Sequence, residues 1–391
     1  MENENAIVVV TGRGMVSSLG SNVVTSCSAA CAGLSRCGDL DLSLVSPPTG
    51  EATPVRGHAA GELTGGFEGF ARLLRLTTFA LADLQKQDPR ALSASPRVGA
   101  YLSVPDPARV STGIDIIADD ESRARRAEEA SRIEQEQPAD VASRLLETAA
   151  TLAELPILPP LRFATFAGHA GVAECFERAV ADVVSGKVQA AIVGGVDSLL
   201  DEETLVWLDT LGRLKRLGVP VGLLPGEAGA FLVLETLRSA KARGARILGT
   251  FRAVCLGKEE ACLLSGAPAH GTAMTRVLER ISGPAGLLGS SPPWVLCDLN
   301  GETHRSTEWG HVLVRLAAQF PAFGAPSVWY PAMSFGDVGA ASGAVAVSMA
   351  LHAMERTMAP SRTALVLSTS DGPGRGAVVL QAPSSPGSVR A

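Results

Sequence analysis

The sequence predicts an α/β fold whose sheets are covered by helices on both faces. Short runs rich in Val, Ile and Leu alternate with Ala-rich stretches of helical periodicity along the chain. The apolar runs are continuous and do not alternate with polar residues, which is typical of strands buried on both faces. Hydrophobic residues make up 46% of the 391 residues and charged residues 19%, a composition that supports a large core and excludes disorder for most of the chain.

The strands are predicted from apolar runs that end at turn residues. In AIVVVTGRG, residues 6–14, a buried run leads directly into a glycine turn. The predicted strands cover residues 6–14, 97–104, 161–168, 189–198, 226–235, 246–257, 294–301, 327–331, 362–368 and 376–381. A strand followed by glycine near residue 7 is echoed near residue 294, a faint sign of two related halves.

Helices are predicted between these strands. Residues 173–186 carry apolar residues at helical spacing and stop at a glycine, which is a C-cap signal, and residues 272–282 and 343–357 behave likewise. Residues 38–65 are rich in Pro, Gly and Ser and are predicted to be irregular. Residues 119–140 carry charges of both signs and are predicted to form a solvent-exposed helix, with a docking surface as the alternative.

Charge and cysteine content limit the function classes. Lys and Arg total 34 against 40 Asp and Glu, and a net charge of −6 removes the electrostatic case for nucleic acid or an anionic membrane. The opening apolar run is short and follows acidic residues, so neither a signal peptide nor membrane insertion is expected. The seven cysteines form no CxxC motif, which argues against a disulfide scaffold or a cysteine zinc site and favours the reducing cytoplasm.

Four segments in order along the chain resemble the β-ketoacyl synthases of the thiolase superfamily. They are residues 8–23, 185–200, 224–235 and 334–351. The resemblance implies a thiolase-like five-layer αβαβα sandwich built from two similar halves, and a dimer. We expect a ketosynthase-like half over residues 1–240, with a charged helical insertion near 105–150, and a second thiolase-like half over residues 241–391.

The residues that carry catalysis in this family are replaced. Counting back along the predicted helix from Gly186 places His169 where the family has its nucleophilic cysteine, and residues 167–171 contain neither Cys nor Ser. Asn300 and Asp337 stand at the positions of the two catalytic histidines. The family's lysine becomes Ala332, its gating phenylalanine becomes Asp371, and Glu308 stands at its acidic position.

Two function classes follow from this replaced triad. The first is a non-condensing scaffold, or the partner subunit of a heteromer. Chain-length factors are of this kind, and ketosynthase-like proteins associated with secretion-system gene clusters are similar. The second is an acyl-thioester hydrolase, decarboxylase or transferase in which Asp337 orients His169 and Asn300 donates to an oxyanion. A helix N-terminus disfavours a charged imidazole, so His169 is expected to be neutral.

Ligands and partners follow from the same residues. His169, Asp337, Glu302 and His304 are suitable metal ligands, but no short signature such as HExxH is present, so neither a metal nor a cofactor is expected. Arg213, Lys215 and Arg216 are interpreted as a solvated turn or as a patch for an acidic acyl carrier protein. Ser306 or Thr307 is expected to cap a helix that begins near Glu308. The expected partners are a second copy or a ketosynthase-like subunit, and acyl carrier protein or acyl-CoA.

Overall fold

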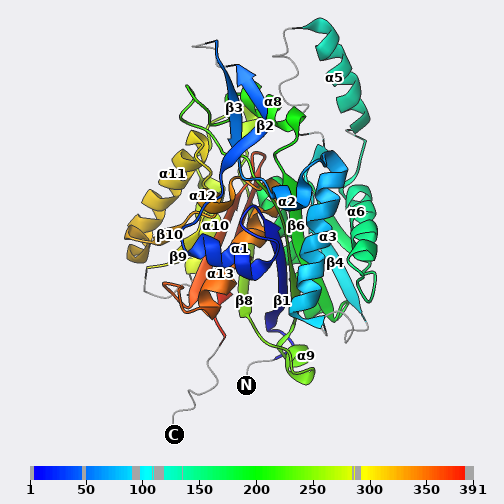
Figure 1. Ribbon diagram of the computed structural model, residues 1–391. Helices are drawn as coiled ribbons and strands as arrows, with labels where there is room; N and C mark the ends of the chain where they lie inside the picture. The colour runs from blue at the N-terminus through cyan, green and yellow to red at the C-terminus, as the bar shows by residue number, and fades with distance from the viewer. Residues whose placement is uncertain are drawn as a thin grey trace.

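The structure, a computed structural model, describes residues 4–45, 50–89, 97–107, 109, 119–133, 135–283, 286 and 292–383. One ten-stranded mixed sheet runs through the molecule, and a separate two-stranded hairpin stands at one end (Figure 1). The predicted α/β class is confirmed.

The ten strands form two groups of five. The first group is β1 (Val8–Ser17), β4 (Val98–Ser103), β5 (Leu161–Thr165), β6 (Ala190–Ser198) and β7 (Glu227–Thr236), in the spatial order β1-β7-β6-β4-β5. The second group is β8 (Gly249–Lys258), β9 (Trp294–Leu296), β10 (Ser327–Trp329), β11 (Thr363–Thr369) and β12 (Gly374–Gln381), in the spatial order β8-β12-β11-β9-β10.

The two groups share one topology. If the five strands of each group are numbered in chain order, their order across the sheet is first, fifth, fourth, second, third in both groups. The pattern of antiparallel and parallel neighbours is also the same in both. The counterpart of β1 is therefore β8 and not the strand at residue 294, so the echo expected there is wrong. The likeness near residue 294 reflects only an apolar run followed by glycine. A division between residues 240 and 241 stays a prediction.

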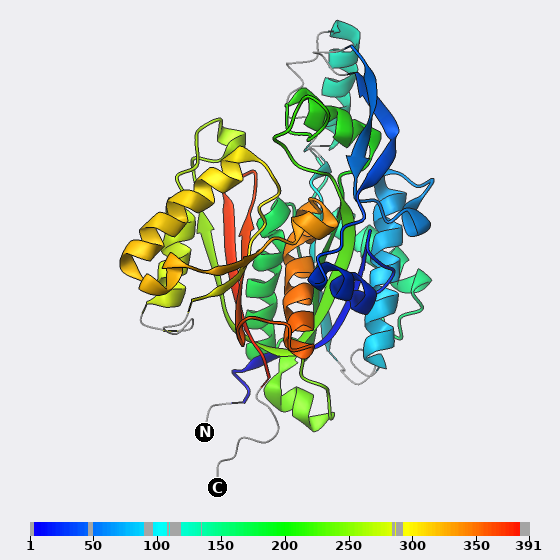
Figure 2. The same cartoon turned by 60° about the vertical axis from the view of Figure 1, so that its left-hand side comes forward.

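Helices complete five layers (Figure 2). On the outer face of the first group lie α3 (Gly69–Gln87) and α6 (Pro138–Leu152), and on the outer face of the second lie α10 (Thr272–Ser282) and α11 (Thr303–Gln319). Between the groups lie α7 (Gly171–Val184) and α13 (Ser342–Glu355). α13 is buried from Gly343 to Ala353, as expected for a helix whose small and apolar residues cover its whole circumference.

Shorter elements join these layers. They are α1 (Val23–Cys31), α2 (Gly61–Thr64), α8 (Glu202–Thr210), α9 (Leu237–Ala242), α12 (Ala332–Phe335), and the 3-10 turns η3 (Gly168–Ala170), η4 (Leu263–Ser265), η5 (Pro321–Gly324) and η6 (Gly339–Ala341). No described helix is long and apolar enough to cross a membrane.

The region expected to be irregular contains a hairpin. β2 (Gly38–Val45) pairs with β3 (Ala52–Gly57). Leu40, Leu42 and Leu44 alternate with polar residues, and this face packs on a small core that includes Leu205 and Leu208 of α8. The period of two in DLDLSLV is a strand signal that the Pro, Gly and Ser content obscured.

The charged region is two helices and not one. α5 (Asp120–Ile133) ends before Pro138, which occupies the first turn of α6. Proline is tolerated there because its missing N–H has no partner at the start of a helix, whereas it breaks a helix interior. Part of the predicted insertion, residues 110–118, lies outside the described residues.

Candidate functional site

His169 lies between the end of β5 and the start of α7. It belongs to the turn η3, which Gly168 enters with a φ of 58°. The hydroxyl of Ser370 accepts a hydrogen bond from the Ala170 amide at 2.9 Å, which ties this turn to the segment after β11. The His169 residue is only 8% exposed.

The structure brings His169, Asn300 and Asp337 together, although they come from three separate segments. His169 Nε2 lies 2.8 Å from Asp337 Oδ1, which also accepts the Gly339 amide at 2.8 Å. Asn300 Nδ2 donates to Asp337 Oδ2 at 2.6 Å and to Glu302 Oε2 at 2.8 Å. Both donor hydrogens of Asn300 are thus used by carboxylates, and in this conformation none is left for an oxyanion.

Arg305 of α11 occupies the other side of the imidazole. Its Nη2 lies 3.2 Å from His169 Nδ1 and donates to Asp371 Oδ1 at 2.9 Å, while its Nη1 donates to Asp298 Oδ2 at 3.2 Å. A guanidinium only donates, so Nδ1 accepts and Nε2 carries the proton toward Asp337 when the ring is neutral. Both nitrogens of His169 therefore have a partner.

Contact with Asp337 opposes the expected resistance of His169 to protonation, which stays a prediction. Burial and the Arg305 guanidinium lower the pKa of His169, but the charge of Asp337 and its hydrogen bond raise it, and the balance lies above the ordinary value of 6.5. The same pair holds the pKa of Asp337 well below its usual range, against the effect of burial. The short turn before α7 affects the pKa of His169 less than a carboxylate in contact with the ring does.

Arg213 joins this cluster and is not part of a solvated basic patch. Its Nε and Nη2 bind the two oxygens of Glu302 at 2.7 and 2.9 Å, and its Nη1 donates to Asp371 Oδ2 at 2.8 Å. Arg216 is likewise turned inward, with both oxygens of Asp209 at 2.5 and 3.1 Å. Of the three residues interpreted as a patch, only Lys215 is exposed. A carrier-binding patch on this turn is therefore wrong.

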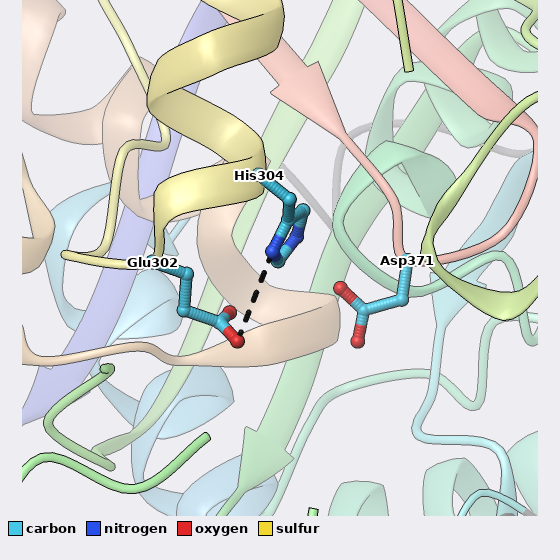
Figure 3. Close-up of side chains that lie close together, drawn as sticks. All are labelled: Glu302, His304 and Asp371. Atoms are coloured by element: carbon cyan, nitrogen blue, oxygen red, sulfur yellow. Dashed lines mark ion pairs between the residues drawn. The ribbon is translucent and has the colours of Figure 1, made fainter. Parts of the chain in front are cut away.

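Glu302, His304 and Asp371 point toward one another beside this cluster (Figure 3). They offer ligand atoms within 4.8 Å of one another, and His304 Nδ1 lies 4.0 Å from Glu302 Oε1. The Arg213 guanidinium, however, already binds both carboxylates. It supplies there the positive charge that a cation would supply, so this donor set fits an arginine and not a metal. Burial lowers the pKa of His304 to about 4, so its ring adds no charge.

A third arginine orders the turn that holds Asp371. Arg375 of β12 binds both oxygens of Glu308 at 2.7 and 2.9 Å, and its Nη1 donates to the carbonyls of Ser370, Gly372 and Gly374 at 2.8 to 2.9 Å. α11 begins at Thr303, so the expected cap at Ser306 or Thr307 is wrong. Glu308 is buried one turn further along and serves this ion pair instead.

A cavity of about 910 Å³ opens in front of His169. Its polar wall is formed by charged groups of the site: His169, Asp337, Arg213, Asp371, and the pair Arg109 and Asp197, whose Nη1 and Oδ1 lie 2.7 Å apart. Its apolar wall is formed by Phe166, Leu199, Trp207, Leu208, Leu223, Leu256 and Leu264.

The space behind His169 is nearly filled. A void of about 20 Å³, room for one water molecule, lies between the ring and helices α12 and α13. Ala332, Phe335 and Val345 are among the residues around it. An acyl chain that entered from the front cavity would therefore find no tunnel beyond the imidazole in this conformation.

The cysteines supply no nucleophile at this site. Cys175 is buried in the interior of α7, and burial raises the pKa of its thiol well above the ordinary value. Cys297 lines the rear void, where burial and Asp298 raise its thiol pKa. All seven cysteines are unpaired. Thiols held protonated in this way are poor nucleophiles.

Sequence reasoning missed Arg305, Arg109 and the role of Arg213. Arg305 lies within NGETHRSTEWG, whose density of polar groups after a buried strand was the available signal. Gly339 was a second signal in the sequence. A Cβ at this position would lie 2.0 Å from Asp197 Oδ2, so only glycine allows that carboxylate to reach the Ala340 amide at 2.8 Å.

Comparison with known proteins identifies the fold. No family model and no curated protein matches the sequence. The ishigamide ketosynthase/chain length factor superposes with a TM-score of 0.71 at 18% identity, covering 97% of this chain and 99% of that one. A type II PKS acyl-carrier protein in complex with its ketosynthase bound to the hexaketide gives 0.71 at 14% identity, with 97% and 99% covered. The ketosynthase from module 6 of the bacillaene synthase from Bacillus subtilis 168 gives 0.69 at 15%, with 97% and 72% covered.

The chain therefore has the thiolase-like fold of these ketosynthases. The predicted five-layer sandwich of two similar halves is confirmed. At these identities the likeness establishes the fold alone, and the chemistry must be argued from the site.

Proposed function

We propose that this protein is a non-condensing member of its fold class that acts as a binding or partner subunit of a ketosynthase-like assembly. The observation that carries the proposal is the state of His169. It stands where the resemblance places the nucleophile, yet it is buried and both ring nitrogens are engaged, by Asp337 and by Arg305.

Condensation needs an acyl group held covalently while a carbanion forms. A thiolate does this because its thioester is stable in water, whereas an acyl-imidazole is labile. Acylation of His169 would also have to displace Asp337 or Arg305 from the ring. The filled space behind the ring adds a second obstacle, because no volume of acyl size adjoins it there.

A partner subunit needs an interface, and β5 offers one. β5 is at the edge of the ten-stranded sheet and pairs only with β4 among the described strands. Such an edge has unpaired backbone groups that a strand of another chain can bind. We propose a dimer through this edge, either with a second copy or with a ketosynthase-like subunit. The unpaired cysteines fit the cytoplasm, where we place the protein.

Native mass spectrometry and acylation together test this proposal. The purified protein is mixed with a ketosynthase from the same gene neighbourhood, and separately with acetyl-, malonyl- and longer acyl-CoA. We expect a dimer, no covalent acyl adduct and no thioester loss above the uncatalysed rate. A protein that stays monomeric in both mixtures, or one that accumulates an acyl adduct, would overturn the proposal.

One observation favours a second candidate, an acyl-thioester hydrolase, decarboxylase or transferase. The His169–Asp337 pair lies 2.8 Å apart and lines the 910 Å³ cavity, which has an apolar wall. In this candidate Asp337 orients His169, and Asn300 donates to an oxyanion after release from one carboxylate. Thioester turnover that disappears in His169→Ala and persists in the exposed control His311→Ala would favour it over the binding subunit.

A further inference from the structure

A second cavity, of about 340 Å³, lies away from His169. It is bounded by β1, the segment after α9, and the C-terminal ends of α3 and α13. In Figure 1 α9 lies at the lower end of the molecule and α8 at the upper end. None of the residues around this cavity borders the cavity in front of His169.

A β-bulge gives this cavity its shape. The pairing of β1 with β7 shifts between Val10 and Gly12, which leaves Thr11 as an extra residue. The Thr11 hydroxyl donates to Glu235 Oε1 at 2.7 Å. Bulges bend a strand and redirect its side chains, and they are common beside functional sites. Here the redirected strand presents Arg13 to the cavity.

Arginine is the most frequent charged residue around this cavity. The four arginines are Arg13, Arg243, Arg246 and Arg356. Arg13 is unusual because it lies in the middle of a buried strand with only 5% of its side chain exposed. Burying a guanidinium is unfavourable unless it is paired, so its place in β1 needs an explanation beyond packing.

The carboxylates present do not balance these arginines. Glu355 is shared, since Arg13 binds its Oε2 and Arg246 lies 2.5 Å from its Oε1. Arg243 binds Asp88 at 2.9 Å and Glu235 at 2.6 Å. Arg356 forms no ion pair with any described residue. Four guanidiniums therefore face three carboxylates, in a protein whose net charge is −6.

Helix ends explain part of this charge but not all of it. α3 and α13 both end here, and the C-terminal end of a helix attracts a cation. One arginine at the C-terminal end of each helix would be enough for this interaction. His352 adds no charge, because burial and Arg13 lower its pKa to about 4. The remaining guanidinium groups are held in place by their carboxylates, which leaves them preorganised to donate to an incoming anion.

We propose that this cavity, bounded by Arg13, Arg243, Arg246 and Arg356, binds a small polyanion through its phosphate or carboxylate oxygens. Guanidinium groups match both kinds of oxygen with paired hydrogen bonds. Its volume lies at the lower end of the range for small-molecule sites, roughly 300–1,000 Å³. The site is independent of His169 and of the proposed partner role.

Calorimetric titration tests this site with two probes, inorganic pyrophosphate and citrate, at a fixed 150 mM NaCl. We expect at least one probe to bind the wild-type protein. The double variant Arg246→Gln/Arg356→Gln should weaken that binding at least tenfold. Both residues are exposed, Arg246 at 72%, so the fold should be retained, and circular dichroism checks this.

The matched control is Arg238→Gln/Arg252→Gln, which removes the same charge from exposed arginines elsewhere. We expect it to bind like the wild type. Binding of pyrophosphate alone would assign the site to phosphate ligands, and binding of citrate alone to carboxylate ligands. The proposal is overturned if neither probe binds the wild type, or if the control weakens binding as much as the test variant.

Discussion

The two charged regions of this molecule have opposite balances. Around His169 the carboxylates outnumber the arginines, since Arg213 and Arg305 face four acidic residues: Asp298, Glu302, Asp337 and Asp371. At the Arg13 cavity the arginines outnumber the carboxylates. The charged groups of the first region pair with one another along the wall of the 910 Å³ cavity, whereas the second region includes the exposed arginines Arg246 and Arg356. The charged groups around His169 thus hold one another in a cross-linked cluster, whereas Arg356 at the Arg13 cavity has no ion pair with a described residue.

The largest effect should come from removing Arg305. Arg305→Met leaves the partly buried Asp298 and Asp371 with one guanidinium fewer, and we expect a loss of about 3 kcal/mol, the lower end for a broken buried ion pair. Urea unfolding at pH 7 measures the change. The exposed control Arg252→Met should change stability by less than about 0.5 kcal/mol. A loss equal to that of the control would contradict the view that the cluster is closed and interdependent.

The next effect should come from Glu308→Gln. The Arg375 guanidinium keeps its three carbonyl partners but loses its charged one, so we expect a loss of about 2–3 kcal/mol. Amide hydrogen exchange should rise over residues 370–374, which Arg375 holds. Glu260→Gln, at an exposed position, is the control. Unchanged exchange over this turn would mean that the backbone alone determines its shape.

Acid should weaken the His169 region more than the Arg13 cavity. Contacts with Arg213 and Arg305 hold the pKa of Asp371 below its usual range, despite burial. A lowered carboxylate pKa adds stability that is present above pH 4 and is lost as the pH falls toward the folded-state pKa. We expect loss of this contribution to lower the free energy of unfolding by about 1 kcal/mol between pH 5 and pH 3. The fall should be smaller in Asp371→Asn, and an equal fall would remove this carboxylate from the explanation.

The smallest effect concerns His169 itself. Its raised pKa means that its pairing with Asp337 adds stability below about pH 6.5, which is lost as the pH rises through the folded-state pKa. In Asp337→Asn the charged partner is gone while burial and Arg305 remain, so the His169 pKa should fall below 6.5. NMR titration of the ring measures it, with exposed His311 as an internal reference. A His169 pKa that stays above 6.5 in the variant would assign the shift to another group.

The fold was largely predictable and the cluster was not. The apolar runs gave the strands because each is buried on both faces, and the order of four motifs gave the fold class. His169, Asn300 and Asp337 could be found because a backbone frame determines which positions converge. The ion pairs could not be predicted, because Arg213 and Arg305 are far in sequence from most of the acids they bind. A charged residue considered alone indicates a solvent-exposed position. The alternation of leucine with polar residues in β2 was visible in the sequence. The Pro, Gly and Ser content around it led instead to the prediction of an irregular region.

The short junction between the two groups of strands has a consequence for cooperativity. β1 and β8 pair through only three positions among the described residues, from Val8 to Val10. Cohesion between the groups therefore depends on α7 and α13, and on side chains such as His169 and Asp337 that come from opposite groups. Neither group can keep this buried middle layer covered alone. The chain should accordingly unfold in a single sigmoidal transition, with no populated state in which one group survives without the other.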